Sequence, residues 1–291
     1  MSARTLVLGG TGMLGREVVA LGRRQGRPVL GLSHTQADIT DPEHIAYWME
    51  TFRPEVLINC AAFTKVDECE HNPATAFAVN EYGAQVLAEA AERAGARLVH
   101  VSTDYVFDGE ASAPYREEAA TGPRSVYGES KLAGEKRVLR GEKNLVVRTS
   151  WLFGPGGPNF VATMCRLFAS GQAVRVVADQ VGCPTYAPFL ARALWELVDC
   201  GARGLVHYRN SDAVSWHHFA VAIADLVRPG IAVEPITTAE FPRPAKRPAY
   251  SVLAVARFEE LTGRRVEPWH LGLAQYFDPA RRGAPGHGGI G

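Results

Sequence analysis

The sequence predicts an α/β fold with a doubly wound parallel sheet and a smaller, interleaved C-terminal lobe. Three observations predict it. Short apolar runs alternate with helical segments through the first half of the chain. The runs contain too few polar residues to leave one face in water, which is typical of parallel strands covered by helices on both sides. A glycine-rich turn also joins the first run to the first helix, as in Rossmann sheets that bind dinucleotides.

Each element is expected from its own pattern. The strands are short apolar segments, and we expect them within residues 5–10, 28–33, 55–63, 97–103 and 144–154. The helices between them have apolar residues at helical spacing, and we expect them over residues 13–26, 42–52 and 72–95 and around Lys131. After residue 154 the alternation loosens, and one further helix is expected near residues 160–170.

This change of pattern predicts two units joined without a linker. Residues 1–154 are expected to form the dinucleotide-binding domain, with later segments returning to it, and residues 155–277 mainly a substrate-binding lobe. Such a lobe is expected to close over a site at the sheet. The glycine-rich tail, residues 278–291, is predicted to be disordered.

Composition favours a small-molecule partner. The 31 Lys and Arg balance the 31 Asp and Glu, without the excess of positive charge that nucleic acids or membrane surfaces attract. No apolar run approaches the roughly 18 residues of a membrane span, so we expect a soluble, cytoplasmic protein. The five cysteines are dispersed and never spaced as CxxC, so neither a disulfide framework nor a metal site is expected.

The first glycine-rich turn is a candidate phosphate site. Gly9, Gly12 and Gly15 follow the first strand with the spacing GxxGxxG. Glycines there let the chain turn tightly and let a diphosphate approach backbone N–H groups at the start of a helix. The alternative is an ordinary glycine turn, since the pattern alone is weak.

The end of the second strand bears on the choice of cofactor. A dinucleotide-binding domain normally has an acidic residue there that bonds the adenosine ribose, but this chain has Ser33, His34 and Thr35. The missing acid removes a charge that would repel a 2′-phosphate, so NADPH is favoured, with NADH left open. Asp38 is expected near the adenine amino group and Ile39 against its ring. Alternatively, Asp38 caps the helix that begins near residue 42.

Two later strand ends supply further candidates. Ala61 and Ala62 follow the third strand, where small residues let a cofactor lie against the backbone or simply allow tight packing. Thr103 and Asp104 follow the fourth strand, at the edge where open α/β sheets bind ligands. The Thr103 hydroxyl could bond a carbonyl oxygen, and an ordinary turn is the alternative.

Tyr127 and Lys131 are the candidate chemical groups. They are four residues apart in a predicted helix, so their side chains lie on one face. We expect the lysine ammonium, together with an oxidised nicotinamide, to lower the pKa of the tyrosine and make it a proton donor near neutral pH. A solvated helix face is the alternative.

Several motifs in order resemble those of one family. The segments STDYVFDG, VYGESKLAGE, VVRTSWLFG, DQVGCPT and RPAYS resemble the dTDP-4-dehydrorhamnose reductase family, a branch of the extended short-chain dehydrogenases/reductases. The resemblance runs to about residue 277. It implies that Tyr127 donates a proton, Lys131 holds the nicotinamide ribose and Thr103 tunes the tyrosine. It implies that Asp104 and Trp151 hold the sugar nucleotide.

The glycine turn, the end of the second strand and the resemblance together give the expected cofactor site. The residues expected to contact the cofactor, besides Tyr127 and Lys131, are Gly9, Thr11, Gly12, Met13, Leu14, Gly15, Ser33, His34, Asp38, Ile39, Ala61, Ala62 and Thr64. Some family members also bind Mg²⁺ at a dimer interface, and a homodimer is expected, although no matching carboxylates can be assigned in this chain.

Three positions are candidates for a substrate diphosphate. Asn159 is expected at the start of a helix, where N–H groups suit an anion. Lys246 and Arg247 are the other two, and for each of the three a cap or a surface charge is the stronger alternative. Tyr250 and Cys183 depart from the family pattern, which puts the identity of the substrate in question.

Three functions follow from the sequence. The first is NAD(P)H-dependent reduction of the C4 ketone of dTDP-4-dehydro-L-rhamnose, giving dTDP-L-rhamnose for polysaccharide biosynthesis. The second is reduction of another dTDP-4-keto-deoxyhexose. The third is a non-catalytic, NADP-binding regulatory subunit resembling that of methionine adenosyltransferase, which Thr103, Tyr127 and Lys131 argue against.

Overall fold

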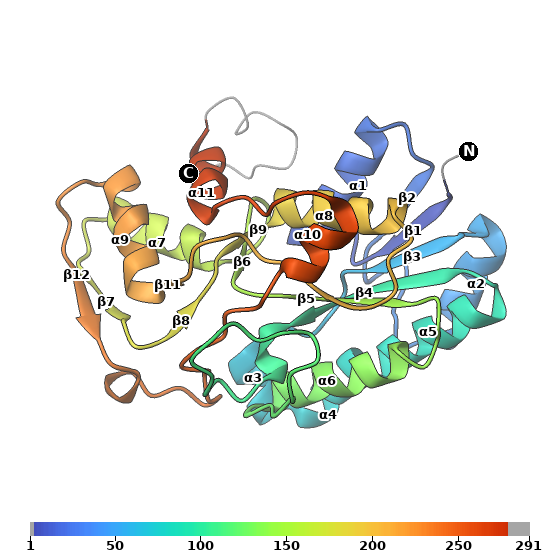
Figure 1. Ribbon diagram of the computed structural model, residues 1–291, viewed down its shortest axis with the longest axis horizontal. Helices are drawn as coiled ribbons and strands as arrows, with labels where there is room; N and C mark the ends of the chain where they lie inside the picture. Colours follow the sequence, from blue (N-terminus) through green and yellow to red (C-terminus); the bar gives the residue numbers. More distant parts are fainter. Residues whose placement is uncertain (1–2, 279–291) are drawn as a thin grey trace.

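The computed structural model describes residues 3–278, so nearly all of the predicted tail lies outside the described residues (Figure 1). Its centre is a six-stranded sheet in which every pairing is parallel, with the strand order β10-β5-β4-β3-β1-β2. The strands are β1 Thr5–Leu8, β2 Val29–Leu32, β3 Val56–Asn59, β4 Arg97–Thr103, β5 Leu145–Thr149 and β10 Gly204–His207. The predicted fold class is confirmed.

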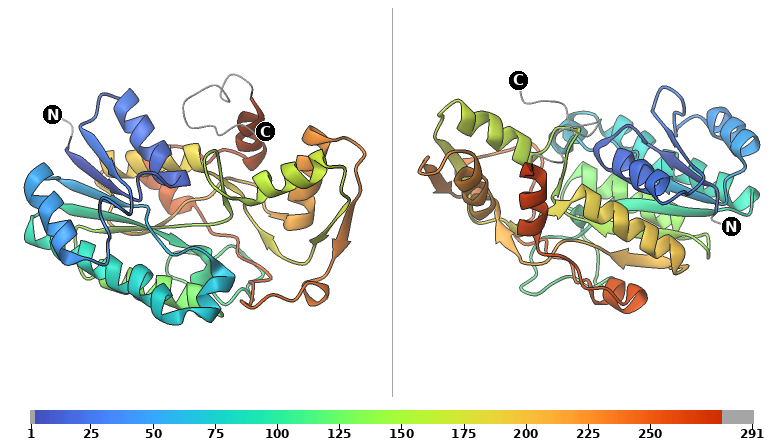
Figure 2. Two further views of the ribbon diagram at one scale, coloured as in Figure 1. Left: turned by 180° about the vertical axis from the view of Figure 1, so that it is seen from behind. Right: turned by 90° about the horizontal axis from the view of Figure 1, so that it is seen from above.

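The strand order places a crevice between two neighbouring strands. The chain goes from β1 outward to β2 and then crosses back to β3 on the other side of β1. Connections leave β1 and β3 in opposite directions, so the loops at their carboxyl ends part and leave room for a ligand. Figure 2 shows helices on both faces of this sheet.

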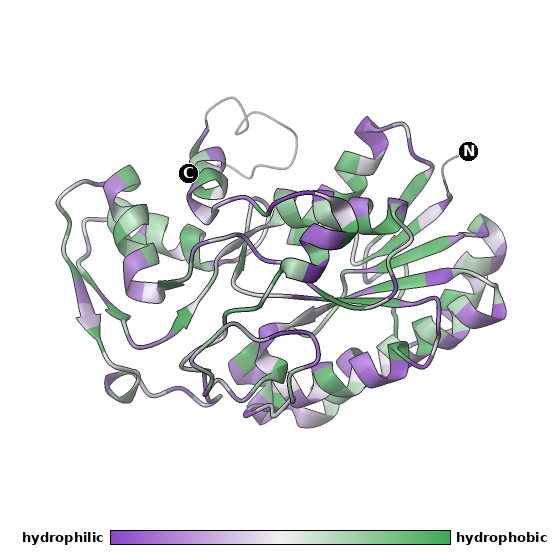
Figure 3. Ribbon diagram, in the orientation of Figure 1, coloured by the Kyte–Doolittle hydropathy of each residue, from purple (hydrophilic) through white to green (hydrophobic). Residues whose placement is uncertain are grey.

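The alternation of side chains builds a core on each face. Val7, Ile58 and Val99 belong to a cluster with α1 (Met13–Arg24) and α8 (Ala187–Asp199). Their strand neighbours Leu6 and Leu57 belong to a cluster with α2 (Pro42–Phe52) and α5 (Gly83–Arg93). Successive strand residues point to opposite faces, so strands buried on both sides must be apolar throughout. Figure 3 shows the central strands as mainly hydrophobic.

The helices cover the sheet in two layers. Helices α1 and α8 pack together on one face of the central sheet, and helices α5 and α6 pack together on the other face (Figure 1). The bounds are α1 Met13–Arg24, α2 Pro42–Phe52, α3 Val66–His71, α4 Pro73–Phe77, α5 Gly83–Arg93, α6 Val126–Val138, α8 Ala187–Asp199 and α10 Ala256–Thr262. The short helix α3 was not predicted.

The helix predicted over residues 72–95 contains a π-helical turn. It consists of α4, the π-helical segment η1 Ala78–Tyr82 and α5. The Asn80 side chain within this turn is buried and bonds both backbone groups of Phe63 and the Ser130 hydroxyl on α6. A wider turn fits here because the Asn80 backbone also lies against Gly134, where a side chain would collide with it.

A second lobe lies beside the carboxyl ends of the strands (Figure 1). Its elements are β6 Leu152–Phe153, α7 Phe160–Ala169, β7 Val174–Val177, β8 Val181–Gly182, β9 Thr185–Tyr186, β11 Val214–Ser215, α9 Trp216–Val227, β12 Val233–Ile236 and α11 Trp269–Phe277. Between these elements, β10 returns to pair with β5 in the main sheet.

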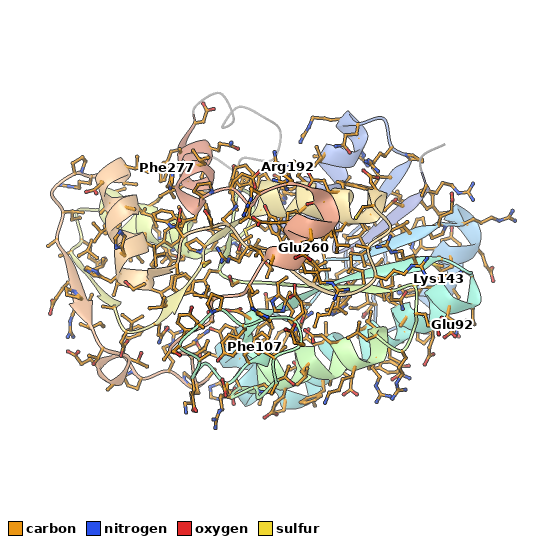
Figure 4. All side chains as sticks on the ribbon, viewed as in Figure 1. Glu92, Phe107, Lys143, Arg192, Glu260 and Phe277 are labelled. Atoms are coloured by element: carbon orange, nitrogen blue, oxygen red, sulfur yellow. The ribbon has the colours of Figure 1, made fainter. Side chains whose placement is uncertain are left out.

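Figure 4 labels Phe107, which is buried, and Glu92 and Lys143, which are exposed. Within residues 3–278, no helix has the length and apolarity needed to cross a membrane.

Candidate active site

The glycine turn after β1 meets the end of β3. Gly9 has a φ of 70°, and a Cβ there would lie 2.8 Å from the Ala61 nitrogen. A Cβ on Gly15 would collide with the Gly9 carbonyl, so α1 also needs a glycine to approach the turn. The turn is therefore tight, and Thr11 is its only residue with a side chain among residues 9–12, as suits a phosphate-binding backbone.

The first turn of α1 offers free backbone donors. Its N-cap is Gly12, which has no side chain to bond the N–H groups, and there is no acid in the first turn. By contrast, Ser125 caps α6 and Asp41 caps α2 with side-chain oxygens. A diphosphate would accept bonds from these uncapped amides and gain from the helix dipole.

The end of β2 has the polar character that was predicted. Ser33 bonds Thr35 and Gln36 through its hydroxyl, and the His34 side chain is 79% exposed. No carboxylate stands among residues 33–36 to repel a 2′-phosphate.

Asp38 and Ile39 differ from expectation in detail. Asp38 accepts bonds from the Thr40 nitrogen and hydroxyl, whereas the cap of α2 is Asp41, so the capping alternative for Asp38 was wrong. The Ile39 side chain is only 4% exposed and lies against Gly83. The expected contact of Ile39 with the adenine ring stays a prediction.

Thr103 and Tyr127 come together at the carboxyl end of β4. Thr103 donates to Asp104 Oδ1 at 3.1 Å and accepts from the Tyr105 nitrogen at 3.2 Å. Burial raises the pKa of Tyr127, and a hydrogen bond with Thr103 only partly opposes this. The phenol is therefore a neutral group that keeps its proton.

Lys131 is a buried lysine whose side chain meets β4. Its Nζ lies 2.8 Å from the Val101 carbonyl oxygen and 3.2 Å from His100 Nε2, so its polar contacts are on β4. Burial lowers the pKa of Lys131 to about 8, against the opposing charge of Glu135. Burial raises the pKa of Tyr127 in the chain alone, and the lowering expected from the ammonium together with an oxidised nicotinamide stays a prediction.

Asp104 is a buried carboxyl beside Thr103. Burial raises its pKa to about 6, and its hydrogen bonds oppose the shift without cancelling it. Tyr250 forms a β-bridge with Val181, two residues before Cys183, so the two departures from the family pattern lie in neighbouring segments. The charge of Asp104 raises the pKa of the buried Cys183 thiol, after the larger effect of burial. Cys183 is therefore within reach of the charge of a predicted substrate contact.

Trp151 forms an aromatic stack with the second lobe. Its ring is 3.6 Å from that of Trp216, with 7° between the planes, and its backbone has a φ of 44°. Gly182 lies beneath the Trp151 ring, where a Cβ would come within 2.7 Å of it. The left-handed backbone is unusual for a bulky residue and is held by this packing.

Asp67 on α3 joins the sheet domain to the segment before Tyr250. It accepts from the guanidinium groups of Arg243 and Arg247, the latter at 2.9 Å, and Arg247 also donates to the Tyr105 hydroxyl at 2.8 Å. Arg247 is thus engaged by protein groups, and Lys246 is exposed.

Asn159 has the role that its alternative interpretation gave it. Its Oδ1 caps α7 by accepting from the Ala162 nitrogen at 3.0 Å. Its Nδ2 donates to the carbonyl oxygens of Gly154 and Gly157. The side chain is therefore used in shaping the loop before α7.

The remaining predicted residues surround the same edge. Ala61 and Ala62 are half-buried, and Thr11 and Thr64 are exposed. Met13 and Leu14 begin α1, and Met13 Sδ lies 3.8 Å from Asn159 Nδ2. Among the described residues there is no group of three or more His, Cys, Asp or Glu side chains suited to a metal ion. The Mg²⁺ expectation therefore has no ligand set in residues 3–278.

Sequence reasoning missed the polar residues beneath the site. Asn59 and His100 lie on β3 and β4 and connect to Lys131. Glu135 lies one turn after Lys131 and pairs with Arg148 on β5. A polar residue within an otherwise apolar strand was the available signal, because a buried polar group needs a partner.

Comparison with known proteins places this geometry in context. The family model described as RmlD substrate binding domain matches residues 3–282. The chain is similar to the dTDP-4-dehydrorhamnose reductase of Streptomyces griseus, at 43% identity over 97% of this chain and 95% of the relative. It is also similar to a probable dTDP-4,6-dihydroxy-2-methyloxan-3-one 4-ketoreductase of Streptomyces antibioticus, at 40% identity over 97% and 99% of the two chains.

A solved structure shows the same similarity in three dimensions. The dTDP-4-dehydrorhamnose reductase of Bacillus anthracis, crystallised in complex with NADP, matches this fold with a TM-score of 0.91. The two chains are 36% identical, and the match covers 95% of this chain and 99% of the other.

Proposed function

The chain belongs to the RmlD substrate binding domain family, and on this premise we propose that it is a dTDP-4-dehydrorhamnose reductase that uses NADPH. The reaction is reduction of the C4 ketone of dTDP-4-dehydro-L-rhamnose to dTDP-L-rhamnose. The observation that carries the proposal is the pairing of a buried, neutral Tyr127 with Thr103 at the sheet edge where α1 begins uncapped. A proton donor and a site for a dinucleotide therefore lie at the same edge of the sheet.

The cofactor fits the residues present. The glycine turn, the free amides of α1 and the polar end of β2 would hold the diphosphate and the 2′-phosphate. When bound, reduced nicotinamide supplies the hydride that the ketone needs. Lys131 is proposed to hold the nicotinamide ribose, with Ala61, Ala62 and Thr64 against the same molecule.

The chain's own residues handle the proton. Tyr127 donates its phenolic proton to the C4 oxygen, and Thr103 holds that oxygen by a hydrogen bond. The raised pKa of Tyr127 ensures that the proton is present at neutral pH. Asp104 and Trp151, both within residues 1–154, are proposed to hold the sugar nucleotide. Apart from these two contacts, residues 1–154 are proposed to serve mainly the cofactor and residues 155–277 mainly the substrate.

The test is turnover with a coupled substrate. dTDP-glucose is first converted by the dehydratase and the 3,5-epimerase, and oxidation of NADPH is then followed by absorbance. Turnover that requires the epimerase supports the proposal. NADPH binding without turnover would contradict it and favour either another keto sugar or the regulatory role.

A second candidate is reduction of another dTDP-4-keto-deoxyhexose. The observation that favours it is that Tyr250 and Cys183, which depart from the family pattern, lie in neighbouring segments, and that the charge of Asp104 acts on Cys183. The Streptomyces antibioticus relative carries such a name. Turnover of the dehydratase product without the epimerase would identify this case.

The remaining expectations stay predictions. They are the homodimer, the cytoplasmic location and the use of NADH in place of NADPH. The regulatory role would be revived by capture of a methionine adenosyltransferase in the absence of any ketoreductase turnover.

A further inference from the structure

Lys131 stands at the end of a buried chain of hydrogen bonds. The Ala61 nitrogen donates to Asn59 Oδ1 at 3.0 Å, and Asn59 Nδ2 lies 3.0 Å from His100 Nδ1. His100 Nε2 lies 3.2 Å from Lys131 Nζ. Asn59, His100 and Lys131 are each 1% exposed, so solvent does not complete their bonds. The direction of every bond is therefore decided by protein groups.

Only one assignment of donors and acceptors satisfies every hydrogen bond from Ala61 to Lys131. The Ala61 N–H can only donate, so the Asn59 oxygen faces it and the Asn59 amide nitrogen faces His100. That nitrogen donates, so His100 Nδ1 accepts and its single proton is on Nε2. The Nε2–H points at Lys131 Nζ, which can accept only as a neutral amine, because an ammonium has no lone pair.

Protonation of Lys131 disturbs this chain. An added proton leaves an ammonium facing an N–H, so the ring must move its own N–H from Nε2 to Nδ1. The Nδ1–H then faces the Asn59 amide N–H, and reversing that amide would leave the Ala61 N–H facing another donor. A buried donor without an acceptor is costly, so each protonated arrangement has one unfavourable contact.

The charges around Lys131 do not remove this preference. The groups that face it are His100 on β4, the Cys60 thiol after β3 and Glu135 on α6. Burial raises the pKa of Cys60 to about 12, so the thiol is neutral, and burial is the largest cause that lowers the pKa of His100 and keeps its ring neutral. Glu135 attracts the ammonium, but its carboxylate is bonded to Arg148 and Ser102.

We propose that Asn59 and His100 are positioning residues that act through Lys131: they present an N–H to its Nζ and so favour the neutral amine. Uptake of one proton from solvent then requires the His100 ring to change tautomer. Because this series of hydrogen bonds begins at the Ala61 N–H, the turn after β3 is coupled to the protonation of Lys131. The inference concerns the site of the proposed reduction, but its test needs no turnover.

The first test observes the His100 ring directly. The full-length protein is labelled with ¹⁵N-histidine, and long-range correlation spectra show which ring nitrogen carries the proton. The His100 signal is the one lost in His100→Gln. At about pH 9, above the Lys131 pKa of about 8, we expect the Nε2–H tautomer. An Nδ1–H tautomer or an imidazolium at that pH would overturn the proposal.

The second test titrates Lys131. The chain has five lysines, and the other four, Lys65, Lys136, Lys143 and Lys246, are exposed and serve as internal references. In ¹³C-lysine spectra we expect Asn59→Leu to raise the Lys131 pKa by about one unit, a tenfold change in proton dissociation. The substitution is similar in shape and neutral, and it removes the donor to His100.

The sign of the shift separates the proposal from a simple structural role. Loss of a polar group makes the surroundings less polar, which would lower the Lys131 pKa. We expect a rise in Asn59→Leu and also in His100→Gln, whose amide oxygen can accept from the ammonium. A fall, or no change, in these variants when folded would overturn the proposal. If neither variant folds, the tautomer of the wild-type ring decides the question.

Discussion

Glu135, on the helix α6 that also carries Tyr127 and Lys131, forms an ion pair with Arg148 on β5 through two hydrogen bonds. Arg148 Nη2 lies 2.6 Å from Glu135 Oε2, and Arg148 Nε lies 2.9 Å from Oε1. Both side chains are at most 4% exposed. The pair ties α6 to β5, so the active-site helix is anchored through a contact that solvent cannot replace.

Removal of one partner should destabilise the protein strongly. In Glu135→Ala the Arg148 charge stays buried without its carboxylate, so we expect the free energy of unfolding to fall by about 3–5 kcal/mol. Denaturant unfolding measures the difference. Glu129→Ala, on the exposed side of the same helix, is the control and should change stability by less than about 1 kcal/mol. Equal losses in the two variants would contradict the importance of the pair.

Tyr127→Phe should abolish most of the reduction. Loss of the phenolic proton is expected to lower kcat by about 10²–10⁴-fold, since general-acid catalysis contributes that much. NADPH binding, followed by calorimetry, should stay nearly unchanged. Tyr82→Phe removes a hydroxyl from a tyrosine that is 45% exposed and should leave both quantities as they are. Substantial turnover by Tyr127→Phe would show that another group donates the proton.

Asp104→Asn should stabilise the protein in a way that depends on pH. The folded pKa of Asp104 is about 6, above the ordinary 3.8, so folding favours the protonated carboxyl. Ionisation of the buried Asp104 carboxyl therefore destabilises the folded protein. This destabilisation is absent below about pH 4 and complete above about pH 6. At neutral pH we expect Asp104→Asn to be more stable by up to about 3 kcal/mol, with no gain at pH 4.

Denaturant unfolding of both proteins at the two pH values tests this prediction. An advantage for Asp104→Asn that is independent of pH would contradict the raised pKa. The same variant should bind the sugar nucleotide more weakly if Asp104 contacts it as proposed. A gain in stability with a loss of affinity is common where a site keeps a buried charge for function.

Asp67→Asn should weaken the connection between α3 and the segment before Tyr250. Burial alone would raise the Asp67 pKa, but hydrogen bonding by Arg243 and the charge of Arg247 outweigh it and lower the pKa below 3.8. The stabilisation is therefore present above about pH 4 and is lost as the pH falls through the lowered value. We expect Asp67→Asn to lose about 1–3 kcal/mol at neutral pH.

Glu68→Gln is a matched control for this prediction. Glu68 lies next to Asp67 on α3 and pairs with Lys65 at 3.0 Å, but both side chains are more than half exposed. Such surface pairs contribute about 0–1 kcal/mol. Thermal or denaturant unfolding at neutral pH should therefore separate the two variants, and a larger loss in Glu68→Gln would show that the Asp67 contacts matter little.

The sequence by itself determined the features that depend on neighbours along the chain. The strands followed from short continuous apolar runs, the helices from apolar residues at a period of 3.6, and the phosphate turn from glycines at fixed spacing. Tyr127 and Lys131 could be assigned to one helix face because four residues make about one turn. These patterns are local, so they are visible before the chain folds.

Tertiary structure decided what each of these groups faces. Lys131 is bonded to His100, 31 residues away, and Asp67 to Arg247, 180 residues away. Burial also raises the pKa of Tyr127 in the chain alone. The physical reason is that desolvation and hydrogen-bond direction depend on groups brought together by the sheet order, and no periodicity along the chain encodes those partners.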